Sequence, residues 1–73
     1  MELKTKQQIG DIIRAARIKC GYTQQELGEK LGYEDRSALV SVQNWERGIR
    51  PVPLDKMRSL SLVLNLSLDD LIP

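Results

Sequence analysis

The stretch that decides the fold, residues 21–48, reads GYTQQELGEKLGYEDRSALVSVQNWERG. It opens with a Thr-x-x-Glu element, Thr23 to Glu26, whose hydroxyl and carboxylate can cap the first turn of a helix. Two leucines four residues apart follow, and this spacing puts them on one helix face. The pattern predicts a short helix over about residues 24–31, ended by Gly32.

The second half of this stretch predicts another helix. Ser37 is a suitable N-cap residue, and Gly48 is a suitable stop. Val42 and Trp45 lie three residues apart, so both can face the core. We therefore expect a helix over about residues 38–47. Two helices joined by a short turn form a helix-turn-helix arrangement.

The flanking segments extend the helical pattern. A capping box from Thr5 to Gln8 opens an amphipathic helix that ends at Gly21. Asn65 suits the left-handed end of a further helix, and Ser67 can cap a short last one. The apolar positions that support these helices are Ile9, Ile12, Ile13, Ala16, Leu54, Met57, Leu60, Leu64, Leu68, Leu71 and Ile72. The expected fold is all-α, about five short helices in a single compact domain over residues 1–73.

Composition limits the core and the chemistry. The chain has 73 residues, 41% of them apolar, with no Phe, so the core must be aliphatic around Trp45. It has no His and only Cys20 as a thiol, so no nucleophile–base pair can be assembled. We expect no enzyme activity, no cofactor, no metal site and no internal disulfide. No signal peptide is visible, the apolar segment 60–68 is too short to span a membrane, and a cytoplasmic protein is expected.

Charge is unevenly distributed although the net charge is only +1. Residues 1–19 carry five basic side chains against two acidic ones, and residues 36–58 also carry five against two. Residues 20–35 carry one basic side chain against four acidic ones. A near-neutral average can therefore hide a basic face suited to nucleic acid.

The polar face of the helix around Trp45 has the chemistry that base reading needs. A recognition helix docks one apolar face on its own domain and offers hydrogen-bonding side chains to base edges. Asn44 and Gln43 can each bond adenine through two hydrogen bonds, and Val40 can pack on a thymine methyl. Ser37 and Ser41 add hydroxyl groups to this face.

Nearly the whole chain resembles the phage repressor and Cro type of helix-turn-helix domain, a lambda-repressor-like family of bacterial and phage regulators. IGDIIRAARIKCGYTQQELGEKLG resembles its first two helices, VQNWERGIRPVP the end of its recognition helix and the next loop, and LDKMRSLSLVLNLSLDDLI its last two helices. The most specific elements are Thr-Gln-x-x-Leu and Trp-Glu-x-Gly. One departure is about four additional residues between Gly32 and Trp45. They either lengthen the turn or add a helical turn at the end that faces DNA. We expect the longer turn, because Glu34 and Asp35 fit poorly against phosphates.

The resemblance implies roles for particular residues. The resemblance implies base contacts by Ser41, Gln43 and Asn44, and the chemistry of the same face adds Val40 and Ser37 as candidates. It implies phosphate contacts by Gln24, Arg47 and Arg50, and we also expect Thr23 and Arg36 to contact phosphates. Arg17 and Glu46 match a family pair that ties the first helix to the recognition helix. The expected partner is a double-stranded DNA operator, with no small-molecule substrate.

The implied function is sequence-specific DNA binding by a bacterial or phage-encoded transcriptional regulator, expected to repress. A protein-interaction module on the same fold, such as an antitoxin or a repressor antagonist, is the alternative, because the charge is near neutral and the turn is acidic. Leucines near the C-terminus exceed what one helix stripe can bury. They are either simply exposed or form a homodimer patch of Leu62, Leu66 and Leu68.

Overall fold

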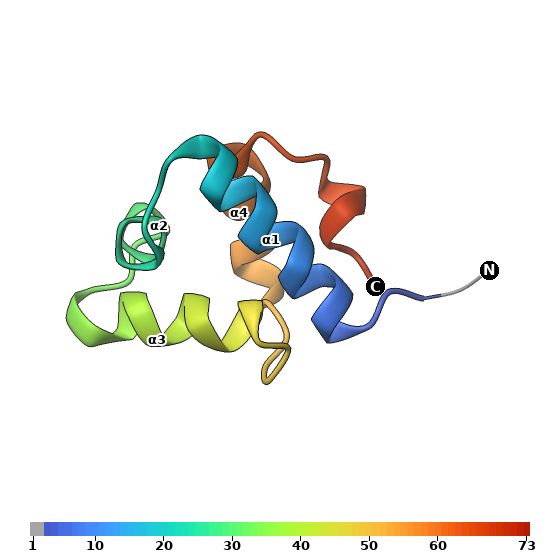
Figure 1. The fold of residues 1–73 in the computed structure, drawn as a ribbon, viewed down its shortest axis with the longest axis horizontal. Helices are drawn as coiled ribbons and strands as arrows, with labels where there is room; N and C mark the ends of the chain where they lie inside the picture. Colours follow the sequence, from blue (N-terminus) through green and yellow to red (C-terminus); the bar gives the residue numbers. More distant parts are fainter. Residues whose placement is uncertain (1–2) are drawn as a thin grey trace.

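The computed structural model describes residues 3–73; Met1 and Glu2, which belong to the expected domain, lie outside the described residues. The described part is all-α and holds four α-helices and one short 3₁₀ helix, without a strand. Figure 1 shows these elements, which are α1 (Lys6–Cys20), α2 (Gln24–Lys30), α3 (Asp35–Glu46), α4 (Leu54–Leu64) and η1 (Leu68–Leu71).

The helices surround one small core. In Figure 1, α3 lies along the lower edge, α2 stands over its left end, and α1 crosses above it with α4 behind. The 3₁₀ helix η1 and both ends of the described chain lie on the opposite side from α2. This arrangement leaves one long side of α3 free of any other helix.

Most helix starts and stops agree with the sequence prediction. The Thr5 hydroxyl accepts the Gln8 N–H at 3.1 Å, and the Thr23 hydroxyl accepts the Glu26 N–H at 3.0 Å. Hydrogen bonds from the Thr23 backbone N–H and hydroxyl lower the pKa of Glu26. Gly21 ends α1 with φ +80°, as expected for a left-handed cap. Helix α2 ends at Lys30, one residue before the predicted end.

The expected fifth helix is wrong. Its Ser67 cap is present, but residues Leu68–Leu71 form a 3₁₀ helix of one turn. An α-helix would need the N–H of residue 73 to bond the Asp69 carbonyl, and Pro73 has no N–H. The Asp69 carbonyl instead accepts a hydrogen bond from Lys4 Nζ at 3.0 Å. The chain therefore tightens to i→i+3 bonding at this point.

The expected start of the recognition helix is also wrong. Helix α3 begins at Asp35 and ends at Glu46, so Ser37 lies inside the helix and is not its N-cap. The additional residues after Gly32 thus lengthen the helix and not the turn. Asp35 has φ +51°, and its carbonyl accepts a hydrogen bond from Gln25 Nε2 at 2.9 Å. An acidic residue in a first helical turn is favourable because it faces the positive end of the helix dipole.

The core is aliphatic around one indole, as composition predicted. Its largest fully buried side chains are Ile13, Leu27, Val42, Leu60 and Leu71. The Trp45 side chain is 4% exposed. No helix within residues 3–73 is long and apolar enough to cross a membrane.

Candidate nucleic-acid interface

Helices α2 and α3 form a tightly packed helix-turn-helix. The turn between them is residues 31–34. Gly28 of α2 lies directly against the backbone of Ala38 in α3, so closely that an added Cβ would overlap it. A glycine at this crossing lets the two helices approach, and the position of α3 is fixed by that approach.

The outward side of α3 carries uncharged polar and small apolar side chains. Successive residues of an α-helix lie about 100° apart, and Ala38, Val42 and Trp45 define the buried side of α3. Val40 and Asn44 fall roughly opposite that side. Val40 is 36% exposed and Asn44 is half-buried. Ser37, one turn before Ser41, is exposed near the beginning of the same side.

Not all expected base contacts lie together. Ser41 and Gln43 are both half-buried, and they are about 160° apart around α3. Gln43 lies on the flank that leads to Glu46, whereas Ser41 lies on the flank that leads to Trp45. The outward side of α3 is therefore centred on Val40 and Asn44, with Ser41 and Gln43 at its two borders.

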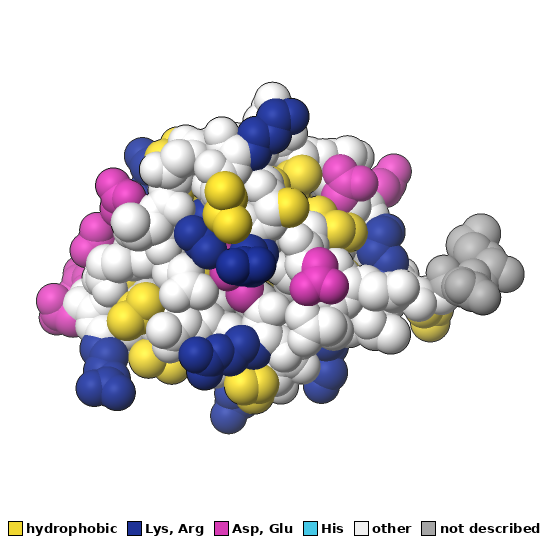
Figure 2. All heavy atoms as spheres, in the orientation of Figure 1, with side chains coloured by type: hydrophobic (Ala, Val, Ile, Leu, Met, Phe, Trp, Pro, Cys, Tyr) yellow, Lys and Arg dark blue, Asp and Glu magenta, His cyan; other side chains and the backbone are white. Residues whose placement is uncertain are grey.

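Exposed basic side chains border the outward side of α3, whereas acidic ones gather around its start and over α2. Arg36 near the start of α3, and Arg47 and Arg50 after its end, are all exposed. Figure 2 shows Lys and Arg side chains along the lower margin, over α3 and the loop after it. Acidic side chains gather at the left margin, over α2 and the turn. Folding thus separates the charges that nearly cancel in the sequence.

The start of α2 is close to α3, but its polar groups already have partners. The Thr23 hydroxyl oxygen caps α2, and the same hydroxyl also interacts with the Glu26 carboxylate. Gln24 donates from Nε2 to Glu46 Oε1 at 3.1 Å. The Gln24 amide nitrogen has a second hydrogen to offer.

An ion pair beneath the interface joins three elements. Arg17 Nε donates to Glu46 Oε2 at 2.6 Å, and Arg17 Nη2 donates to Glu46 Oε1 at 3.1 Å. Arg17 Nη1 also donates to the Tyr22 carbonyl at 2.9 Å. The Glu46 side chain is only 3% exposed. This pair links α1, the end of α3 and, through Gln24, the start of α2.

Two hollows lie on either side of the loop that follows α3. One, of about 330 Å³, is lined by Tyr33, Ser41, Asn44 and Arg50 together with Trp45 and two prolines. Tyr33 has no site role in the sequence prediction. In the sequence, Tyr33 stands out only as an aromatic residue directly after Gly32. Its contact with Trp45 in α3 cannot be predicted from spacing.

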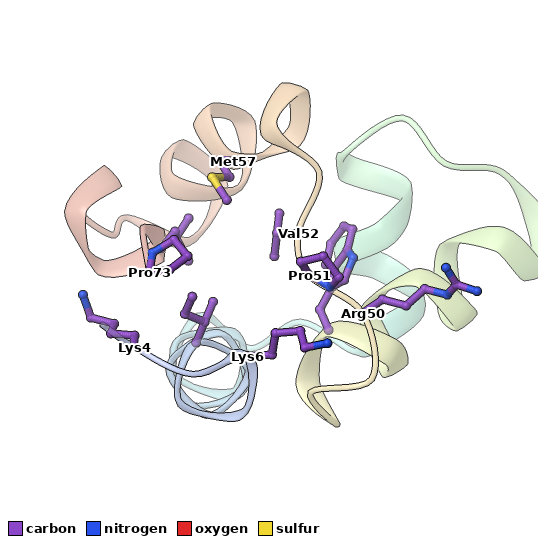
Figure 3. Close-up of a pocket in the computed structure, with 10 residues that line it drawn as sticks. Lys4, Lys6, Arg50, Pro51, Val52, Met57 and Pro73 are labelled. Atoms are coloured by element: carbon purple, nitrogen blue, oxygen red, sulfur yellow. The ribbon is translucent and has the colours of Figure 1, made fainter. Parts of the chain in front are cut away.

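The other hollow, of about 120 Å³, is apolar. Figure 3 shows Val52, Met57 and Pro73 around it, while the charged ends of Lys4 and Arg50 extend away from it. The charged side chains thus contribute mainly their stems. We interpret this hollow as incomplete packing between the two ends of the chain and the loop after α3.

This packing gap allows a stabilising substitution. Val52 is 6% exposed and lines the gap, so Val52→Ile adds a methylene to empty space. We expect it to raise the free energy of unfolding by about 0.5–1 kcal/mol in urea titrations. Val42→Ile is the control: Val42 is fully buried away from the gap, so the same methylene should overpack and cost about 1–3 kcal/mol. Equal destabilisation by both changes would contradict the interpretation.

The leucines near the C-terminus are only partly free. Leu62 is 75% exposed and Leu68 is 44% exposed. Leu66 is half-buried and packs against the core. Of the expected dimer patch, therefore, two members face outward and one is largely occupied within the chain.

Comparison with known proteins agrees with this geometry. A family model described as helix-turn-helix matches residues 13–71. The HTH-type transcriptional regulator ImmR of Bacillus subtilis (strain 168) is 36% identical over 64 residues, which cover 88% of this chain and 47% of ImmR. The chain thus spans about half the length of that relative. No solved structure matches this chain. Because the family model matches well over half of the chain, this chain belongs to the helix-turn-helix family, in its repressor and Cro-like form.

Proposed function

We propose that this chain binds double-stranded DNA sequence-specifically as part of a transcriptional regulator, and that it represses by occupying a promoter. The observation that carries the proposal is the outward side of α3, where Val40 and Asn44 lie between exposed arginines. The name of the relative ImmR, an HTH-type transcriptional regulator, supports the same function.

In the proposed complex, α3 enters the major groove, which is wide enough to admit a helix. Asn44 and Gln43 bond base edges, Val40 packs on a thymine methyl, and the Ser37 and Ser41 hydroxyls complete the reading side. Phosphates are held by Thr23 and Gln24 at the start of α2 and by arginines around α3, namely Arg36, Arg47 and Arg50. Such contacts fix register and orientation, while base contacts give specificity.

We further propose that two copies act together. One helix-turn-helix unit reads few bases, and a two-fold pair reads two half-sites. Leu62 and Leu68 offer an exposed apolar surface for this pairing near the C-terminus, with Leu66 beside them.

Selection of bound duplexes from a random pool, at roughly physiological salt, tests the proposed function. Specific binding survives this salt concentration far better than non-specific binding does. An enriched palindrome would support a sequence-reading dimer, and an enriched single half-site would support a monomer. Absence of enrichment by the folded protein would contradict the proposal.

A second candidate function rests on the acidic surface over α2 and the turn in Figure 2. A protein-interaction module, such as an antitoxin or a repressor antagonist, could use this surface to bind a basic partner. Salt titration on duplex DNA distinguishes the two candidates. A protein that binds DNA through several phosphates loses affinity steeply as the salt concentration rises. A protein-interaction module of this kind should show no saturable binding to duplex DNA.

Two alanine variants separate base reading from phosphate binding. Asn44→Ala should cost about 1–3 kcal/mol of binding free energy on the preferred duplex and relax base preference at one position. Arg50→Ala should weaken binding to all duplexes similarly and reduce the salt slope by about one. Fluorescence anisotropy on preferred and scrambled duplexes measures both effects. If Asn44→Ala weakens both duplexes equally, the assignment of Asn44 to base reading is wrong.

A further inference from the structure

The 330 Å³ hollow beside α3 brings together polar groups that spacing in the sequence does not connect. Tyr33 comes from the turn before α3, Ser41 from its flank, and Arg50 from the loop after it. A water molecule takes about 30 Å³ in the liquid, so the hollow has room for a tetrahedral oxyanion together with several waters. Pro51 and Pro53 stiffen the wall on the loop side.

The Tyr33 ring is held from two directions. It packs edge-on against Trp45, with ring centroids 5.9 Å apart and planes inclined by 62°. Lys56 Nζ lies 5.0 Å from the ring centroid, and it donates a hydrogen bond to the Leu31 carbonyl at 2.9 Å. These contacts fix the ring, and therefore the direction of its hydroxyl, without using the hydroxyl itself.

The hydroxyl stays a donor at neutral pH. Partial burial raises the pKa of Tyr33, and the negative charge of Asp55 raises it further, while the neighbouring Ser41 hydroxyl lowers it in part. A protonated phenol can donate to an anion, as can the hydroxyl of Ser41 and the guanidinium of Arg50. Arg50 is the charged residue among those that line the hollow, and Lys56 Nζ adds a second positive charge over the Tyr33 ring.

We propose that Tyr33, Ser41 and Arg50 form a clamp for one backbone phosphate of the DNA at the flank of α3. This inference rests on the proposed function and deepens it. It assigns Tyr33 as a DNA contact, and it moves Ser41 from base reading to phosphate binding. Asn44, on the outward side of α3, also lines this hollow, so the clamp sets how far Asn44 enters the groove.

Tyr33→Phe tests the clamp because it removes only the hydroxyl and keeps the ring between Trp45 and Lys56. The expected result is about tenfold weaker binding to the preferred and the scrambled duplex alike, since one hydrogen bond to a charged group is lost. Tyr22→Phe is the matched control. Tyr22, the only other tyrosine, lies before α2 with Lys30 Nζ 5.0 Å from its ring centroid, and losing its hydroxyl should change no affinity.

Duplexes carrying one uncharged methylphosphonate at each position in turn identify the phosphate. At one position the methylphosphonate should weaken binding by the wild-type protein about as much as Tyr33→Phe does. On that duplex, Tyr33→Phe and Ser41→Ala should cause no further loss of affinity. The clamp is overturned if no position shows this coupling, or if Tyr33→Phe changes base preference. Unchanged thermal unfolding of the variants keeps either result interpretable. If the wild type binds no duplex at all, the proposed function itself fails, and the clamp fails with it.

Discussion

Glu46→Ala is expected to lower the free energy of unfolding by about 3–5 kcal/mol, the typical cost of leaving one partner of a buried ion pair without the other. In this chain the loss strands the Arg17 guanidinium, whose side chain is only 12% exposed, and it also removes the acceptor for Gln24. Small domains have a total stability of only about 5–15 kcal/mol, so the variant should be partly unfolded at 37 °C. Urea titration followed by circular dichroism measures the change.

The control and a double variant sharpen this test. Glu29→Ala removes an exposed acid on α2 and should change stability by less than about 0.5 kcal/mol. Combining Arg17→Met with Glu46→Leu replaces both charges by apolar side chains of similar length. The double variant should be more stable than Glu46→Ala, because no charge is left buried without a partner. A double variant as unstable as Glu46→Ala would show that the unpaired Arg17 charge is not the source of the lost stability.

Gly28→Ala should destabilise the protein although alanine is the better helix former. Alanine in a helix interior is favoured over glycine by about 1 kcal/mol. At Gly28, however, the new Cβ would overlap the backbone of Ala38, and backbone cannot rotate away as a side chain can. We expect a net loss of about 1–3 kcal/mol and a displaced α3. Thermal unfolding measures the first effect, and loss of duplex binding by the remaining folded protein measures the second.

Gly21→Asn is the matched glycine control. A Cβ at Gly21 would meet no atom within 4 Å, and φ is +80°, a conformation that asparagine tolerates better than most residues. Gly21→Asn should lower the free energy of unfolding much less than Gly28→Ala does, and it should leave duplex binding intact. A stabilised Gly28→Ala protein would mean that α2 and α3 can separate freely, which would contradict the tight crossing.

The elements best predicted from sequence are those fixed by local chemistry. Thr5 with Gln8 and Thr23 with Glu26 satisfy their own helix ends within four residues, so spacing alone identifies them. The start of α3 could not be read in the same way. Ser37 is a better cap than Glu34 by local rules, but burial of Ala38 and the bond from Gln25 to the Asp35 carbonyl extend the helix towards α2.

The interface shows the same division between local and distant causes. Val40 and Asn44 lie on the side of α3 opposite its buried residues, and the helical period of about 3.6 residues predicts this. The pairing of Arg17 with Glu46 spans 29 residues and came only from the family resemblance. Neither periodicity nor the family resemblance predicts the hollow around Tyr33. The hollow depends on the path of the loop between α3 and α4, and no pattern in the sequence encodes that path.

Trp45 occupies a position with a practical consequence. It is the only tryptophan of the chain, it is 4% exposed, and it lines both hollows while its ring meets the edge of Tyr33. Its fluorescence therefore comes from a single known place, the inner side of α3 between the two hollows. Emission from this one indole can test the proposed phosphate clamp on one side and follow filling of the gap on the other, in an unlabelled protein and in real time.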